Sequence, residues 1–177
     1  MKRNTFLLAV LIPILLMAGC ATASRDPLRA DGTWCVYSAR SKLCTRDPVP
    51  SKAEAAQASA AMPVSNMQDI WIVRNEERDR WGRVKVDVGG TVFEMLPGTA
   101  VRLVRPVGET SVRVLDRSGP SDLPVVISTS GKHYIQTASR WGVLEDTFGL
   151  ERISEAAGVA LLQKSTLLAN RDQRSTR

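Results

Sequence analysis

Apolar and polar residues alternate with a period of two through most of the chain between Asp69 and Thr137. In a strand this alternation gives one apolar face and one polar face, whereas a helix repeats about every 3.6 residues. The clearest run is 83–88, in which three valines alternate with Arg83, Lys85 and Asp87. The pattern therefore predicts that short strands are the main elements of the fold.

Turn residues separate these runs at Gly89-Gly90, Pro97-Gly98, Pro106-Val107-Gly108, Ser118-Gly119-Pro120 and Ser130-Gly131. Gly89-Gly90 lies between two extended runs and predicts a hairpin, because both positions tolerate positive φ. Residues 70–73 are apolar on both faces, which is typical of a central strand covered on both sides. We expect a mainly β fold, an antiparallel β-sandwich of about six to seven short strands, with a partly closed barrel as the alternative.

One C-terminal α-helix is expected to follow the strands. Ser154 is a suitable N-cap, and Glu155 would lie at the favourable positive end of the helix. Apolar residues fall at helical spacings as far as Leu168, which predicts a helix to about Ala169 that packs on the sheet. Gly158 costs such a helix about 1 kcal/mol relative to alanine. Residues 170–177 are polar and basic, and are expected to form a disordered tail.

The N-terminus has the order of an export signal: Lys2 and Arg3, an apolar run over 6–17, and then small residues. The run ends in Leu16-Met17-Ala18-Gly19-Cys20, which resembles the lipobox of bacterial lipoproteins, with Met17 in the slot where leucine is usual. The resemblance implies removal of residues 1–19, acylation of Cys20 and a membrane anchor through lipid. Ala21, by similarity to the enterobacterial sorting pattern, implies the outer membrane, with the chain facing the periplasm.

A second signal-peptide cleavage site is the alternative to cleavage before Cys20. Ala21-Thr22-Ala23 is an A-x-A pattern, and cleavage after it would give a soluble product that begins at Ser24.

Two further cysteines, Cys35 and Cys44, form an even pair in a chain sent to an oxidising compartment. A bond between them would close a short loop, for which chain entropy gives roughly 2–3 kcal/mol. The chain has no C-x-x-C motif and no histidine near the pair, so metal binding and redox catalysis are disfavoured. A structural disulfide is expected.

The segment 20–67 is expected to be a lipid-anchored tether that contains this disulfide loop. Its stretch from Lys52 to Met62 is rich in alanine and favours a loose helix, but it lacks a strong apolar stripe to hold it against a core. We therefore interpret it as a spacer. The expected organisation is a signal peptide over 1–19, the tether over 20–67, a β-sandwich domain with its helix over 68–169, and the tail.

Charge gives one hypothesis about a partner. The formal net charge of the 177-residue chain is +6, and removing Lys2 and Arg3 leaves 22 basic and 18 acidic residues, or +4. If the hairpins pair in the simplest register, four basic residues share one sheet face: Arg83, Lys85, Arg102 and Arg113. Such a face suits an anionic envelope component or an acidic protein surface, although a solvated outer face is the common alternative. The export signal argues against nucleic acid.

Catalytic patterns are missing from the sequence. His133 is the only histidine, so a histidine metal cluster cannot form within one chain, and no G-x-S-x-G elbow or phosphate-binding loop occurs. The charged run 76–80 is interpreted as local pairing of little energetic value. Trp81 and Trp141, each followed by glycine, could flank a ligand groove, but aromatic core packing is more common. We expect no enzyme, no cofactor and no metal.

Several segments together resemble a family of uncharacterised bacterial lipoproteins with a small PEGA-like β domain. They are Ile70–Arg74, Val84–Asp87, the run 93–99, Pro106–Glu109, the strand Gly131–Ile135 and the E-x-x-G-x-x-L-L helix Glu155–Leu162. The histidine of the family's P-G-x-H turn is missing here. The resemblance implies a periplasmic β-sandwich and no catalytic residues. We therefore expect a non-enzymatic envelope lipoprotein that acts as a binding or assembly module.

The alternative function is an accessory lipoprotein of a secretion or conjugation apparatus. Lipoproteins of conjugative secretion machines show a similar order, a lipobox followed closely by paired cysteines, and here this resemblance covers only the N-terminal part.

Overall fold

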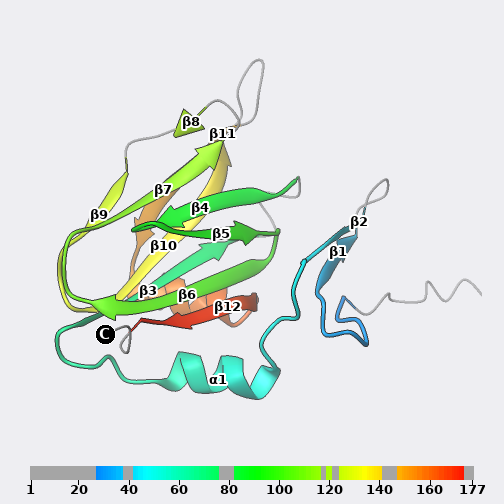
Figure 1. Cartoon of the computed structure of the whole chain (residues 1–177), viewed down its shortest axis with the longest axis horizontal. Helices are drawn as coiled ribbons and strands as arrows, with labels where there is room; N and C mark the ends of the chain where they lie inside the picture. Colours follow the sequence, from blue (N-terminus) through cyan, green and yellow to red (C-terminus); the bar gives the residue numbers. More distant parts are fainter. Residues whose placement is uncertain are drawn as a thin grey trace, which may run out of the picture.

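The computed structural model describes residues 27–37, 42–75, 82–116, 119–120, 124–140 and 147–173. Within these ranges the chain forms twelve strands and two helices (Figure 1). The fold is mainly β, as the alternation predicts. The expected six or seven strands and single helix are wrong in number, because several strands are only two or three residues long and one lies where a helix was expected.

One sheet has five strands in the order β11-β10-β3-β6-β12, and we call it the mixed sheet. Its strands are β3 (Met67–Arg74), β6 (Thr99–Pro106), β10 (Gly131–Arg140), β11 (Thr147–Ile153) and β12 (Thr166–Asp172). The pairs β3–β10 and β6–β12 are parallel, so the expectation of a wholly antiparallel fold is wrong for this sheet. Parallel neighbours arise because the chain crosses to the other sheet or through a helix before it returns.

The second sheet is antiparallel throughout, and we call it the antiparallel sheet. It contains β4 (Val84–Val88), β5 (Thr91–Met95), β7 (Thr110–Asp116) and β8 (Gly119–Pro120), with β9 (Val125–Ile127) also paired to β7. The hairpin predicted at Gly89-Gly90 is confirmed: β4 pairs with β5, and the two glycines have φ of 56° and 88°.

The two sheets enclose one apolar core. It takes alternate residues from both sheets: Ile70, Ile72, Val101, Leu103 and Ile135 from the mixed sheet, and Val84, Val86, Val88, Phe93, Met95, Val112, Val114 and Ile127 from the antiparallel sheet. The three valines of the run 83–88 are thus on the buried face, as the alternation predicts. Strand β3 lies at the centre of the mixed sheet and all eight of its residues are buried, which confirms the prediction for 70–73.

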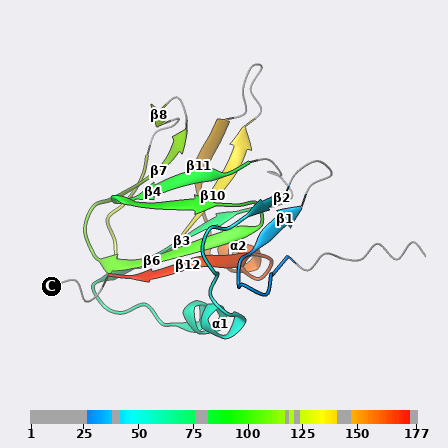
Figure 2. The ribbon, with the colours of Figure 1, turned by 45° about the vertical axis from the view of Figure 1, so that its right-hand side comes forward.

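Two helices cover the other face of the mixed sheet, α1 (Lys52–Ala60) and α2 (Glu155–Leu162) (Figure 2). Beneath them lies a second apolar cluster, formed by Ala58, Trp71, Tyr134 and Leu167. The interpretation of 52–62 as a detached spacer is therefore wrong. Helix α1 needs no wide apolar stripe, because small alanines let it lie close to the sheet.

Ser154 caps α2, as predicted, with its side chain accepting a hydrogen bond from the Ala157 N–H. The expected helix to Ala169 is wrong, since α2 ends at Leu162 and the chain re-enters the mixed sheet as β12. The expected tail is also wrong over 170–172, which lie in β12. The adjacent leucines Leu167 and Leu168 fit a helix by spacing, but in β12 a register shift between Leu167 and Ala169 lets Leu167 contact the helix side and Leu168 the core.

The disulfide between Cys35 and Cys44 is confirmed. It links β1 (Cys35–Tyr37) to β2 (Lys42–Cys44), and the two cysteines are direct partners in this small antiparallel hairpin. In Figure 1 the hairpin stands beside the two main sheets and is not part of either. Among the described residues, no helix has the length and apolar character needed to cross a membrane.

Candidate functional site

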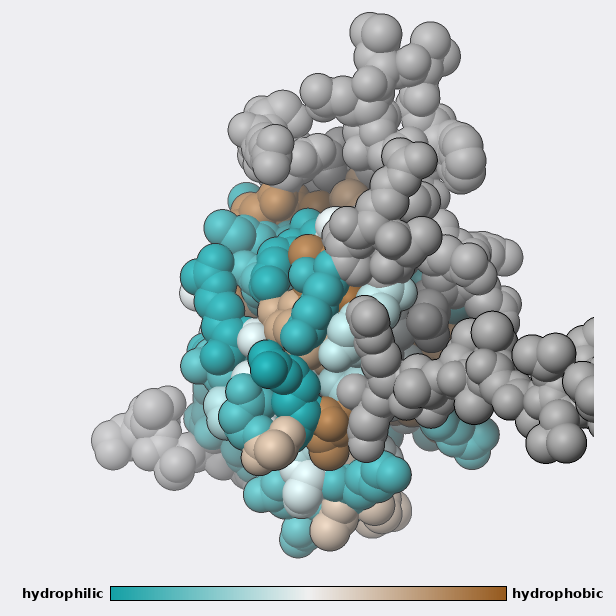
Figure 3. Space-filling model, turned by 90° about the vertical axis from the view of Figure 1, so that its right-hand side faces the viewer, coloured by the Kyte–Doolittle hydropathy of each residue, from teal (hydrophilic) through white to brown (hydrophobic). Residues whose placement is uncertain are grey.

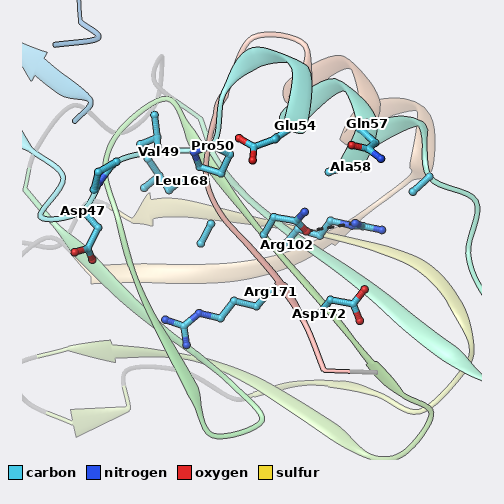
Figure 4. Close-up of a pocket in the computed structure, with 14 residues that line it drawn as sticks. Asp47, Val49, Pro50, Glu54, Gln57, Ala58, Arg102, Leu168, Arg171 and Asp172 are labelled. Atoms are coloured by element: carbon cyan, nitrogen blue, oxygen red, sulfur yellow. Dashed lines mark hydrogen bonds between the residues drawn. The ribbon is translucent and has the colours of Figure 1, made fainter. Parts of the chain in front are cut away.

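A cavity of about 760 Å³ runs along β12, and we call it the β12 groove. Its walls are α1, the segment 47–50 and β12, with Arg102 of β6 at its base (Figure 4). The residues that line it are Asp47, Pro48, Val49, Pro50, Glu54, Gln57, Ala58, Ala61, Arg102, Leu168, Ala169, Asn170, Arg171 and Asp172. Its volume falls in the range of about 300–1,000 Å³ common for ligand sites.

Strand β12 presents its edge to this groove. It is the last strand of the mixed sheet, and within the described ranges it pairs only with β6. Five consecutive residues, 168–172, line the cavity, although successive side chains of a strand point to opposite faces. A cavity bounded by residues of both faces must run along the edge of the strand. The groove therefore exposes a strip of strand backbone.

The walls of the groove across from β12 are the segment 47–50 and α1, and each is held by its own hydrogen bonds. The Val49 N–H donates to the Gly32 carbonyl at 2.9 Å, so this extended segment is tied to the preceding loop and does not pair with β12. The Ser51 side chain then accepts from the Glu54 N–H at 3.3 Å, and the Glu54 carboxylate accepts from the Ser51 N–H at 2.8 Å, which is a capping box. These bonds start α1 next to the groove.

The Glu54 carboxylate is ionised at neutral pH. The hydrogen bonds donated by the Ser51 backbone N–H and then by its hydroxyl hold the pKa of Glu54 below its usual range. A fixed negative charge therefore lies on the α1 wall of the groove.

Arg102 at the base forms a buried ion pair. Its Nε and Nη2 donate to the two carboxylate oxygens of Asp69 at 2.8 and 2.9 Å, and the two side chains are only 7% and 2% exposed. Its Nη1 donates to Asn170 Oδ1 at 3.3 Å, and the guanidinium lies 5.3 Å from the centre of the Trp71 ring. The two-point geometry fixes the guanidinium plane against β3, with Nη1 directed to β12.

Tyr134 lies in the same cluster beneath the helices. Burial raises the pKa of its phenol, and the negative charges of Glu155 and Asp69 act in the same direction. Lys132, two residues earlier on the same strand, donates from Nζ to the Ser59 carbonyl at 3.1 Å and ties α1 to β10. The helix wall of the groove is thus attached to the sheet at several points.

A smaller cavity of about 240 Å³ lies on the other side of β12, toward β5. Asp47, Leu168, Ala169 and Arg171 line both cavities, so the two are adjacent along β12. The Arg171 guanidinium lies 5.3 Å from the centre of the Phe93 ring, across the opening between the two sheets. Figure 3 shows that the described part of one face of the molecule is mostly hydrophilic, with apolar residues in separate spots.

The proposed basic face is wrong as a single surface. Arg102 lies on the mixed sheet, is 6% exposed and faces the helices, whereas Lys85 and Arg113 lie on the antiparallel sheet. Sequence alternation identifies which residues share a face of one strand but does not assign the strand to a sheet. Arg102 is therefore on one sheet, Lys85 and Arg113 are on the other, and Arg83 lies just before β4 in neither.

The remaining basic residues have acidic neighbours. Arg83 forms an ion pair with Glu94, and its Nη2 donates to the Cys44 carbonyl at 2.6 Å. Arg113 Nε lies 3.8 Å from Asp87 Oδ2. The outer face of the antiparallel sheet is accordingly mixed in charge, and it carries no argument for an anionic partner.

Other sequence candidates fall elsewhere. Cys20 and the signal peptide, Trp81, Trp141, the charged run 76–80 and residues 174–177 lie outside the described residues. His133 lies on β10, as expected for a histidine on a sheet, with Nε2 2.9 Å from the Thr129 carbonyl. In the described ranges, no group of three or more His, Cys, Asp or Glu side chains could hold a metal ion.

Sequence reasoning missed both Asp69 and the groove. A carboxylate next to the apolar run 70–73 is a signal for a buried ion pair, because burying an unpaired charge is costly. That signal points to Asp69 but not to its partner. The groove was not predictable once residues 166–169 had been assigned to a helix, since it requires β12 as an edge strand.

Comparison of the chain with protein-family models, with curated proteins and with solved structures gives no significant match.

Proposed function

We propose that this chain is a non-enzymatic envelope lipoprotein that acts as a binding or assembly module. The observation that carries the proposal is the β12 groove, a large cavity bounded by a strand edge, one helix and a fixed ion pair. Among the described residues, its lining consists of carboxylates, guanidiniums, amides and apolar side chains, which can bind both polar and apolar groups of a partner. Such a site is suited to recognition.

The anchor in this proposal is an acylated Cys20, followed by a periplasm-facing domain at the outer membrane. The lipobox-like order before Cys20 and the residue Ala21 favour it, and the disulfide at Cys35–Cys44 is consistent with an oxidising compartment. The two facing sheets and their shared core favour the β-sandwich architecture of the PEGA-like lipoprotein family.

Intact mass and membrane fractionation of the wild type beside Cys20→Ser test the anchor, each with and without reductant. We expect an acylated mass in the outer-membrane fraction, lost in Cys20→Ser, while the mass change on reduction of the Cys35–Cys44 bond is the same in both. A soluble wild-type product that begins at Ser24 would overturn the anchored module.

A second candidate is an accessory lipoprotein of a secretion or conjugation apparatus. The observation that favours it is the disulfide hairpin β1–β2, which follows soon after Cys20 and stands apart from the main sheets. Co-purification of the wild type with a multiprotein envelope complex, lost when both Cys35 and Cys44 are replaced by serine, would favour this candidate.

A further inference from the structure

We propose that the β12 groove binds an extended, basic segment of a partner protein, which adds to the mixed sheet as a sixth strand beside β12. This inference rests on the proposed role as a binding module and names the chemistry of its partner. Peptide addition to a sheet edge derives affinity from main-chain hydrogen bonds and specificity from pockets for alternate side chains.

The backbone of β12 is the first argument. A strand that pairs on one side has alternate N–H and C=O groups directed to its other side, and these groups require hydrogen-bond partners. The edge away from β6 opens on a cavity of about 760 Å³, and in the segment 47–50 on another wall of this cavity the Val49 N–H donates to the Gly32 carbonyl. Water can pair with these groups one by one, whereas another extended backbone offers donors and acceptors at the matching spacing along the whole edge.

The walls of the groove are the second argument. Side chains of an added strand would alternate between α1, at Gln57 and Ala61, and the smaller cavity lined by Leu168 and Arg171. Gln57 is exposed and Ala61 is small, so the α1 side leaves room for side chains of the guest.

Arg102 adds a fixed donor at the base of the groove. A guanidinium has five N–H groups, and three of them are accounted for by Asp69 and Asn170. The Asp69 ion pair keeps this guanidinium in place where it lines the groove.

The charge of the groove identifies the guest as basic. Two carboxylates of its lining, Asp47 and Glu54, stand against Arg171, and the charge of Arg102 is already balanced by Asp69 outside the groove. The groove is thus acidic in a chain whose net charge is +6. A second copy of this basic chain is a poorer guest, because its own β12 lies beside its own α1 and would bring a second helix into the same space.

Selection from a random nonapeptide library displayed on phage, with the full-length mature chain in detergent as bait, tests the proposal. We expect enrichment of peptides with lysine or arginine among residues of high strand propensity. The same peptides, made synthetically, should slow amide hydrogen exchange in β12 more than in β11, the other edge of the sheet.

Two pairs of variants localise the binding. Gln57→Trp fills the groove from α1 and should abolish binding, whereas Gln163→Trp, a matched change at an exposed position after α2, should leave it intact. Asp47→Lys should weaken binding about three- to tenfold, while Glu109→Lys, the same change at an exposed loop position, should have little effect.

Four results of the peptide experiments would overturn the proposal: no enriched peptide, enrichment of acidic peptides, equal binding to both members of each variant pair, or no slowing of exchange in β12. Self-association of the peptide-free chain that protects β12 would overturn it in favour of a second copy. Peptide binding does not depend on acylation, so a failed anchor with intact binding, or the reverse, distinguishes the groove from the lipoprotein assignment.

Discussion

Gly158 lies in the middle of α2, where the helix crosses the ring of Tyr134. A Cβ at this position would lie within 2.7 Å of the Tyr134 Cβ and closer still to two ring atoms. Helix propensity alone predicts that Gly158→Ala gains about 1 kcal/mol. The close contact with Tyr134 predicts instead that Gly158→Ala destabilises the protein.

We expect Gly158→Ala to lower the free energy of unfolding by about 1–3 kcal/mol, because overpacking forces α2 away from β10. Denaturant unfolding measures the change, and Ala157→Gly, at an exposed position of the same helix, separates packing from propensity. Stabilisation by Gly158→Ala would show that α2 does not lie on Tyr134.

Asp69 and Arg102 give a second prediction at the residue scale. Asp69→Ala leaves the Arg102 guanidinium buried without its counter-charge, and removal of one partner of such a pair costs about 3–5 kcal/mol. The double variant Asp69→Val with Arg102→Leu should recover much of this loss, since apolar residues often replace a buried ion pair without penalty. Thermal unfolding of the three proteins checks this. A double variant less stable than Asp69→Ala would contradict it.

The same pair shows what a single sequence can reveal about a site. Asp69 stands out because it adjoins the apolar run 70–73, and a buried partner could be expected for it. Its partner could not be chosen among the basic residues, because the pairing of β3 with β6 joins residues 33 positions apart. The alternation marked Arg102 as polar, and the helices that cover its face of the sheet turned that polar face into a buried one.

At the scale of elements, the capping box of α1 has a defined pH dependence. The folded pKa of Glu54 is lowered, so its contribution to α1 is present above the pKa of the unfolded chain and is lost as pH falls through the lower folded value. We expect the exchange protection of α1 to decrease on acidification in the wild type and to vary less in Glu54→Gln.

A titration of the Glu54 carboxyl by NMR gives the control. Ser51→Ala removes the hydroxyl donor but keeps the backbone N–H, so the pKa of Glu54 should move part of the way up toward its usual value. An unchanged pKa in Ser51→Ala would mean that the hydroxyl does not contribute to the box.

Strand β12 shows where sequence patterns fail at this scale. Thr166 begins a strand parallel to β6. The leucines that follow it match a continuation of α2 equally well by spacing. Short apolar runs do not distinguish a helix from a strand, and only the long-range pairing with β6 decides between them. The hairpin at Gly89-Gly90 was predictable for the opposite reason, because its pairing is local and its turn residues specify it.

At the scale of the whole molecule, the sequence indicated one core and two kinds of face but not which strands are neighbours. Alternation correctly placed the three valines of β4 on a buried face, and they share the core with Val101 of β6 and with Val112 and Val114 of β7. It could not predict the parallel pairs β3–β10 and β6–β12, since parallel neighbours need crossovers that leave no local signal. The domain boundary expected at residue 68 stays a prediction, and the packing of α1 against a cluster with side chains of β3, β10 and β12 bears on it.

The boundary can be measured directly with two shortened chains. A chain that begins at Thr45 keeps α1, and one that begins at Pro63 lacks it and exposes the outer sides of Trp71 and Leu167. We expect the second chain to be less stable than the first by about 2–4 kcal/mol in denaturant unfolding, since burial of a large apolar side chain contributes about 1.5–3 kcal/mol.

A matched pair of substitutions in the full chain separates loss of packing from loss of length. Ala58 is buried against the sheet and Ala56 is exposed on the same helix, so Ala58→Asp should reproduce much of the loss and Ala56→Asp should not. Equal stability of the two shortened chains would show that α1 is the spacer its composition suggests, and the β12 groove would then lack a stable wall. A loss of stability confined to the chain that begins at Pro63 and to Ala58→Asp would place the start of the folded domain ahead of α1. The folded domain would then include the helix that forms one wall of the β12 groove.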